Sequence, residues 1–169
     1  MTAEEFLGLV GRFAGRPMPA VHGRHVYLWH GDMDRLVNAA PADVCRALDL
    51  HSLAATLLKA PRALDEARQL LRRAIQQQLD AWRHAPHQQV IVVTGCDLLC
   101  RYQVALAPFF AAASECVMVV MVVSSAETAF QPAEPLPEYV ALNPRAALDY
   151  LRAALDQPEA VINPDQEAS

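Results

Sequence analysis

Two almost uninterrupted apolar runs limit most strongly what this chain can fold into. Residues Val90–Val93 and Cys116–Val123 consist of aliphatic side chains with Met and Cys. A strand that is apolar on both faces has to be covered on both faces, which is typical of a parallel sheet inside an α/β protein. We therefore expect the two runs to lie side by side at the centre of a mostly parallel sheet.

The rest of the chain alternates between strand-like and helix-like patterns. Strands are predicted at 25–30, 44–50, 89–94, 116–123 and 138–142. Helices are predicted at 2–13, 33–39, 51–59, 62–83, 98–113 and 144–155, with Pro108 kinking or restarting the fifth. Strands that alternate with helices predict the α/β class, with five parallel strands in one layer and helices on both faces.

Length and charge restrict the organisation and the partners. The 169 residues suffice for one domain, which we place at 25–156, after an N-terminal helix and linker (1–24) and before a polar, disordered tail (157–169). The net charge of −5 argues against a generally basic nucleic-acid surface. Acidic Glu4 and Glu5 stand where a signal peptide would be basic, and no run is long enough to span a bilayer, so a cytoplasmic protein is expected.

The strand at 89–94 ends where a P-loop NTPase would carry an acidic ligand for Mg²⁺, but this chain has Thr94 there. The loop after the first strand begins at Gly31. It has one glycine and no lysine, and Asp32 and Asp34 would repel a triphosphate. The loop is either a variant nucleotide pocket or, as the residues favour, an ordinary turn in which Asp32 caps a helix. We predict no cofactor and no catalytic residue.

Cys96 and Cys100 form a C-x₃-C pair that could belong to a metal site or a redox pair. Structural zinc needs about four ligands at characteristic spacing, and the strand would carry His84 and His87 to its opposite end. Buried thiols are the favoured interpretation, and no metal is predicted. The other two cysteines, Cys45 and Cys116, also stand in apolar contexts typical of buried free thiols.

Three further charged residues are candidates for contacts. Asp97 falls at the carboxyl edge of the sheet, where α/β proteins usually bind ligands, although a helix N-cap is the favoured role. Arg68 and Arg72 are four residues apart on the long predicted helix, so they share a face that could contact an acidic partner or phosphate. The alternative is that this face is simply solvated.

The order of these segments resembles a known family. Residues Leu48–Leu58, the arginine-rich helix, Val90–Cys100 and Cys116–Val123 resemble BrxF, the small P-loop protein of BREX phage-defence systems, over about residues 25–155. The resemblance implies a P-loop NTPase-like sheet. The phosphate-binding lysine of that family has no counterpart after Gly31, its metal-binding acid falls on Thr94, and its second acidic residue falls near Asp97. With these departures, the resemblance implies a degenerate ATPase.

The leading hypothesis is a non-catalytic, P-loop-like subunit of a bacterial defence or DNA-processing assembly that binds larger protein partners. DNA would then be contacted indirectly, no membrane is involved, and self-association stays open. One alternative is a nucleotide-binding regulatory subunit with an unusual phosphate loop. Another is a small thiol- or metal-dependent enzyme, which would need Cys96 and Cys100 to face each other beside a further ligand.

Overall fold

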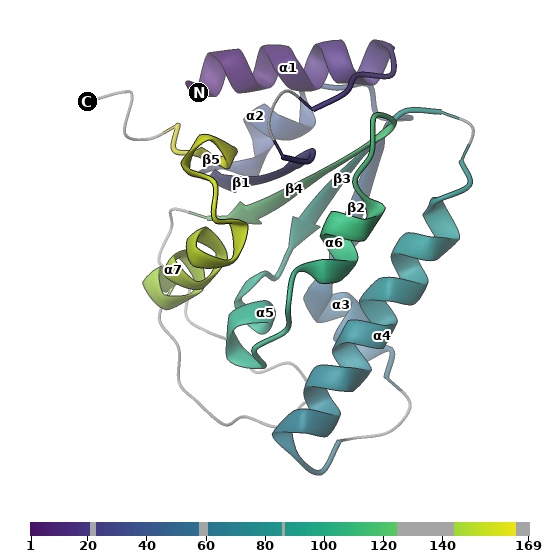
Figure 1. The fold of residues 1–169 in the computed structure, drawn as a ribbon, viewed down its shortest axis with the longest axis vertical. Coiled ribbons are helices and arrows are strands. Elements are labelled where there is room, and N and C mark those ends of the chain that lie inside the picture. Colours follow the sequence, from purple (N-terminus) through teal and green to yellow (C-terminus); the bar gives the residue numbers. More distant parts are fainter. Residues whose placement is uncertain (21–22, 58–60, 86, 125–143, 165–169) are drawn as a thin grey trace.

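The computed structural model of the chain describes residues 1–20, 23–57, 61–85, 87–124 and 144–164 (Figure 1). Its strands are β1 (Val26–His30), β2 (Cys45–Asp49), β3 (Gln89–Thr94), β4 (Val117–Val123) and β5 (Val161–Ile162). Its helices are α1 (Ala3–Gly15), α2 (Met33–Val37), α3 (Leu50–Ala55), α4 (Leu64–Trp82), α5 (Asp97–Arg101), α6 (Ala107–Ala112), α7 (Pro144–Leu155) and the 3₁₀ turn η1 (Pro158–Ala160).

The five strands form one sheet in the order β2-β3-β4-β1-β5, and every pair is parallel. This confirms the predicted α/β class with a five-stranded parallel sheet. The predicted neighbours β3 and β4 do pair, with Ile91 opposite Val119, and β4 is the central strand. The order differs from the 2-1-3-4-5 order of flavodoxin-like folds because β4 lies between β1 and β3. The loops that follow β1 and β3 are therefore separated by one strand.

Helices cover both faces of the sheet, as predicted. One core lies under α3, α4, α5, α6 and α7 and takes alternate strand residues such as Leu28, Ile91 and Val119. The other core lies under α1 and α2 and takes the intervening residues, such as Trp29 and Val120. Figure 1 shows α1 along one side of the sheet and the longer helical layer on the other. Two-sided burial explains why β4 has no polar side chain along its length.

The N-terminal helix α1 belongs to the second core rather than to a separate appendage. Thr2 caps it through the predicted capping box: the Glu5 N–H donates to Thr2 Oγ1 at 3.2 Å, and the Thr2 N–H donates to Glu5 Oε2 at 2.8 Å. Phe6 is fully buried, and its ring lies 5.0 Å from the ring of Tyr27 between centroids. Helical spacing then brings Val10 into the same core.

The long helix α4 follows its apolar period. Ala67, Leu71, Ile75 and Leu79 are spaced by four and are all buried against the sheet, so one stripe of the helix faces the core. Its opposite face keeps arginine and glutamine in solvent. The predicted helix 62–83 is confirmed within two residues at its start and one at its end.

The predicted helix 98–113 is two short helices, because Pro108 restarts it. α5 ends at Arg101, Gln103 takes a positive φ of 51°, and α6 begins at Ala107 with Pro108 in its first turn. Proline is tolerated there, since the N–H it lacks would have no helical acceptor. The break leaves α5 as a separate unit at the carboxyl edge of β3.

The prediction of a disordered tail from residue 157 is wrong for residues 157–164. Val161 and Ile162 form β5, which pairs with Leu28 and Trp29 of β1, and Ile162 is fully buried. Two β-branched residues in a polar segment gain a partner only once β1 is folded, so local composition hides them. The strand predicted at 138–142 lies outside the described residues.

Candidate functional site

The loop after β1 is closed by main-chain bonds. The Gly31 N–H donates to the Val123 carbonyl at 3.0 Å, so it points along the sheet instead of into an open cradle. Asp32 caps α2 as predicted, because its Oδ1 accepts from the Asp34 N–H at 3.0 Å. The Trp29 indole N–H donates to the Asp32 carbonyl at 2.8 Å, which links the loop to a buried side chain of β1.

The C-terminal segment covers this loop. Pro164 packs so tightly on Gly31 that a Cβ added there would lie 2.5 Å from Pro164 Cγ. Asn163 holds the segment in place: its Oδ1 accepts from His30 Nδ1 at 3.1 Å and from Arg152 Nη2 at 3.2 Å. The space beside the Gly31 Cα is therefore filled by the Pro164 ring.

The loop after β3 has a different character. Thr94, half-buried, ends β3 opposite Asp49 of β2. Gly95 follows with a φ of +71°, and a Cβ added there would lie 2.7 Å from Cδ2 of His51. Two independent demands therefore require glycine at this position, namely the left-handed backbone and the close approach of the imidazole.

His51 and Asp97 form a pair at this edge. The His51 Nε2–H donates to Asp97 Oδ1 at 3.0 Å, and the side chains keep 34% and 28% of their surface exposed. The hydrogen bond to Asp97 raises the pKa of His51, and Asp49 adds to the rise, while partial burial and Arg101 oppose it. The imidazolium form is thus favoured by the fold.

The favoured role of Asp97 as a helix N-cap is wrong. Cys96 occupies the N-cap position of α5, with no side-chain cap bond, and Asp97 is the first helical residue. Its carboxylate turns to His51 instead. Sequence reasoning missed His51, and the only available signal was Asp49 just before it: Asp49 Oδ1 accepts from the His51 N–H at 3.1 Å, which fixes the start of α3.

The pair can hold or transfer a proton, because imidazole titrates near neutral pH and the carboxylate orients it. In the described part of the chain, no group of three or more His, Cys, Asp or Glu side chains could hold a metal ion. The arrangement at the end of β3 is therefore a titratable polar site.

Cys96, just before α5, and Cys100, within it, are core thiols, as the sequence favours. Cys96 is 2% exposed, and burial raises its pKa to about 12. Their thiols point to different carbonyls: Cys96 Sγ donates to Val93 O at 3.4 Å and Cys100 Sγ to Ala146 O at 3.5 Å. Neither contact brings the sulfurs together as a metal or redox pair would need.

The other two cysteines, Cys45 and Cys116, are free, as predicted, but they are only half-buried, whereas the sequence predicts buried thiols. Cys45 lies on the edge strand β2, which pairs on one side with β3, and Cys116 comes just before β4. Edge and strand-start positions leave part of a side chain in contact with solvent. Their exposure is therefore a consequence of where the sheet ends.

Of the predicted contact pair on α4, Arg68 and Arg72, only Arg72 is exposed. The Arg68 Nε–H donates to the Tyr102 carbonyl at 2.9 Å and its Nη1 to Asp65 at 3.0 Å, so Arg68 links α4 to the end of α5. Arg72 is exposed, and its neighbour Arg73 is exposed beside it. Within the described part of the chain, the exposed cations that α4 presents are therefore Arg72 and Arg73.

Together, the fold and the two strand ends define an α/β protein with a five-stranded parallel sheet, in which Pro164 covers the loop after β1 and the His51–Asp97 pair lies at the end of β3. No family model matches the chain, and searches of curated proteins and of solved structures found no match. In the described residues, no helix has the length and apolar character needed to cross a membrane.

Proposed function

We propose that the chain is a non-catalytic, P-loop-like (pseudo-ATPase) subunit that acts by binding larger protein partners. The observation that carries the proposal is the closed Gly31 loop: Pro164 fills its open side, and Val123 takes its N–H. The resemblance of the sequence to BrxF is what suggests a bacterial anti-phage defence or DNA-processing complex as the setting of this subunit. A scaffold of this kind retains the parallel sheet but does not bind or hydrolyse a nucleotide.

The chemistry of phosphate loops supports this proposal. Such a loop presents several converging N–H groups, a lysine for the phosphates and a hydroxyl for Mg²⁺. Here the loop has one glycine, and the Asp32 carboxylate accepts the N-cap hydrogen bond of α2. Asp34 adds further negative charge. Thr94 at the end of β3 offers Mg²⁺ no charge. A triphosphate would meet repulsion at one strand end and no metal at the other.

Isothermal titration with ATP and Mg²⁺ tests the loss of nucleotide binding. We expect no affinity tighter than about millimolar, which corresponds to at most about 4 kcal/mol. The variant Pro164→Ala, which uncovers Gly31, should bind ATP no more tightly than the native chain, because opening the loop supplies no lysine. Micromolar binding by the native chain would instead support the alternative of a nucleotide-binding regulatory subunit.

The arginines of α4 are the proposed contact of this subunit with its partner. The apolar stripe of α4 packs on the sheet, which leaves Arg72 and Arg73 in solvent, where each can form bidentate bonds to a carboxylate. Arg68 contributes less than the sequence predicts, because Tyr102 and Asp65 already use its donors. The partner that fits this face is an acidic protein surface.

Affinity capture with this chain as bait, from a lysate of the native host, should identify the partner. A captured protein counts as the partner only if, once purified, it binds the purified chain again (recapture). Arg72→Glu with Arg73→Glu should abolish that recapture and leave the fold intact, because exposed substitutions usually change stability by only about 0.5 kcal/mol. Gln77→Glu is the matched control, since it adds one negative charge to an exposed position of the same helix. Undiminished recapture by the double variant would place the contact elsewhere.

The salt dependence of binding separates a protein partner from DNA. The net charge of −5 favours a protein, and any contact with DNA would then pass through that partner. Direct binding through several phosphates would weaken steeply as salt rises, whereas a protein interface would change little. Light scattering of the purified chain decides whether it also self-associates.

The structure gives less support to a thiol- or metal-dependent enzyme. A nucleophilic cysteine needs a lowered pKa, whereas burial raises that of Cys96 to about 12 and also raises that of Cys100. A metal centre would need ligands from outside the described residues. This alternative therefore ranks below both binding functions.

A further inference from the structure

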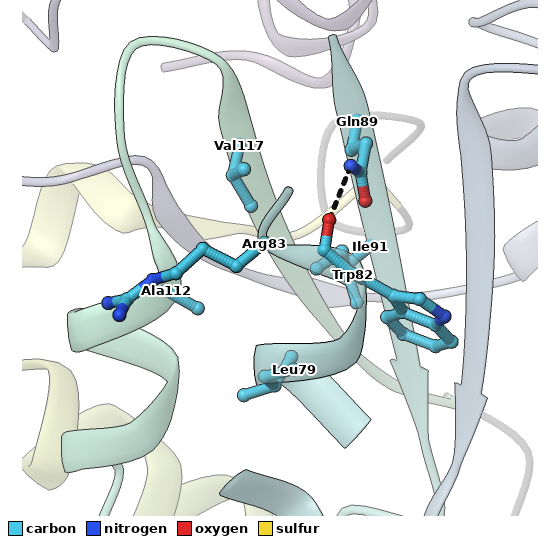
Figure 2. Close-up of a pocket in the computed structure, with 7 residues that line it drawn as sticks. All are labelled: Leu79, Trp82, Arg83, Gln89, Ile91, Ala112 and Val117. Carbon is cyan, nitrogen blue, oxygen red and sulfur yellow. Dashed lines mark hydrogen bonds between the residues drawn. The ribbon is translucent and has the colours of Figure 1, made fainter. Parts of the chain in front are cut away.

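A small hollow lies at the opposite edge of the sheet, between the end of α4, the end of α6 and the starts of β3 and β4 (Figure 2). It has room for about one water-sized group. Its walls are mostly apolar, with two polar exceptions. The lining residues are Leu79, Trp82, Arg83, Gln89, Ile91, Ala112 and Val117.

Gln89 places a buried acceptor in this hollow. The residue is only 3% exposed, and the structure gives its Oε1 no hydrogen-bond partner among the described residues. Buried polar atoms without any partner are rare in folded proteins, so such an atom points to something that is bound. The hollow is the space from which a donor can reach it.

A flip of the Gln89 side-chain amide would not remove the unpaired acceptor. Its Nε2–H donates to the Trp82 carbonyl at 2.8 Å, as Figure 2 shows, with Oε1 on the other branch of the amide. A flipped amide would set its oxygen against that carbonyl oxygen and lose the bond. The Gln89 main chain is also fixed, because its N–H donates to the Cys116 carbonyl at 2.9 Å. The orientation that leaves Oε1 without a partner is thus the one the surroundings impose.

The lining of the hollow selects the occupant. Arg83 lines the hollow, but its Nη2–H donates to the Ala111 carbonyl at 3.2 Å, and Figure 2 shows its side chain extending toward Ala112, away from Gln89. An anion would meet the acceptor Oε1 of Gln89, and the apolar walls give a cation no further ligands. A small neutral group suits the hollow, since it can donate a hydrogen bond to Oε1 of Gln89.

We propose that the hollow is a binding site for a single ordered water molecule that donates a hydrogen bond to Oε1 of Gln89. The water completes the hydrogen bonding of a buried amide that joins the end of α4 to the start of β3. It is thereby part of the fold at this edge of the sheet, in the way that buried waters usually are.

A crystal structure at a resolution that places ordered water is the test. We expect a density peak within hydrogen-bond distance of Gln89 Oε1 in the native chain, and its loss in Gln89→Met, which keeps the side-chain length without an acceptor. Gln77→Met makes the same chemical change at an exposed position of α4 and should keep the peak. The native map decides by itself if Gln89→Met does not fold.

Three outcomes would overturn the proposal. The first is an empty hollow in the native map. The second is a protein N–H that donates to Gln89 Oε1 directly. The third is a peak that persists in Gln89→Met, because other groups would then hold the water. In solution, a nuclear Overhauser effect between water and the Gln89 side-chain amide protons should be present in the native chain and absent if the hollow is empty.

Discussion

Gly31 and Gly95 follow two strands of one sheet at the same edge, and each has another residue packed where its own Cβ would lie. At Gly31 the neighbour is Pro164, an apolar ring that closes the loop, at 2.5 Å from the Cβ position. At Gly95 it is His51, whose imidazole is paired with Asp97, at 2.7 Å. The first strand end is sealed, and the second is polar and titratable.

One local signal, a glycine after an apolar strand, thus leads to opposite surroundings in these two loops. The loop of β1 is determined by the far C-terminus, which arrives as β5 and covers it. The loop of β3 is determined by its sheet neighbour β2, whose Asp49 starts the helix that carries His51. A ligand at this edge of the sheet would therefore meet its polar groups beside β3 rather than beside β1.

Gly95→Ala should be the most damaging change at either loop. The alanine would have to adopt a φ of +71° and push its Cβ against the His51 ring and main chain, so we expect a loss of about 2–3 kcal/mol. Urea unfolding followed by circular dichroism measures this. Gly15→Ala is the matched control, since nothing lies within 4 Å of its Cβ position. A neutral Gly95→Ala would mean that the β3 loop can relax.

Gly31→Ala should cost less, about 1 kcal/mol, because only the Pro164 ring has to move. The double variant Gly31→Ala with Pro164→Ala should recover most of the loss, since the smaller side chain leaves room for the new Cβ. The same unfolding experiment measures the coupling between the two sites. Additive losses would show that Pro164 does not press on Gly31 in solution.

Asp97→Asn should lower stability by about 0.5–1 kcal/mol at pH 6, a modest effect because the pair is partly exposed. The sign of the pH dependence follows from the raised pKa of His51. The stabilisation is fully present below the unfolded-state pKa of His and is lost as pH rises through the folded-state value. The variant should therefore approach the native stability at pH 8. A constant difference across this range would exclude a charged His51.

The pKa of His25 should be shifted in the opposite direction to the pKa of His51. It is buried, its Nε2–H donates to the Met18 carbonyl at 2.7 Å, and burial lowers its pKa. A lowered pKa stabilises the fold above the unfolded-state value, and this contribution declines as pH falls below it. An NMR titration of the histidine ring protons should thus find His51 protonated at a pH where His25 is still neutral. The reverse order would contradict both assignments.

Residue patterns predict much of the fold because its elements depend on local physics. The continuous apolar run Val117–Val123 could only be a covered strand, and the spacing of four between Leu71 and Ile75 could only place one face of α4 on the core. The caps of α1 and α2 rest on Thr2 and Asp32, whose side chains bond within three residues. Such features need no knowledge of distant segments.

The candidate site depended on distant segments and was predicted only in part. Thr94 and Asp97 stand where the apolar strand ends, so their place at the sheet edge could be predicted. The role of Asp97 could not, because His51 is 46 residues away and reaches it only through the pairing of β2 with β3. Arg68 also left its predicted role, since the break after α5 put the Tyr102 carbonyl within its reach.

Residue types and their spacing establish a parallel α/β sheet, a loop without a phosphate-binding lysine after Gly31 and a neutral end of β3 at Thr94. The packing of Pro164 on the Gly31 loop and the pairing of His51 with Asp97 depend instead on the folded arrangement of distant segments. Period and residue type determine which side chains are buried, whereas the order of strands in the sheet determines which distant residues meet.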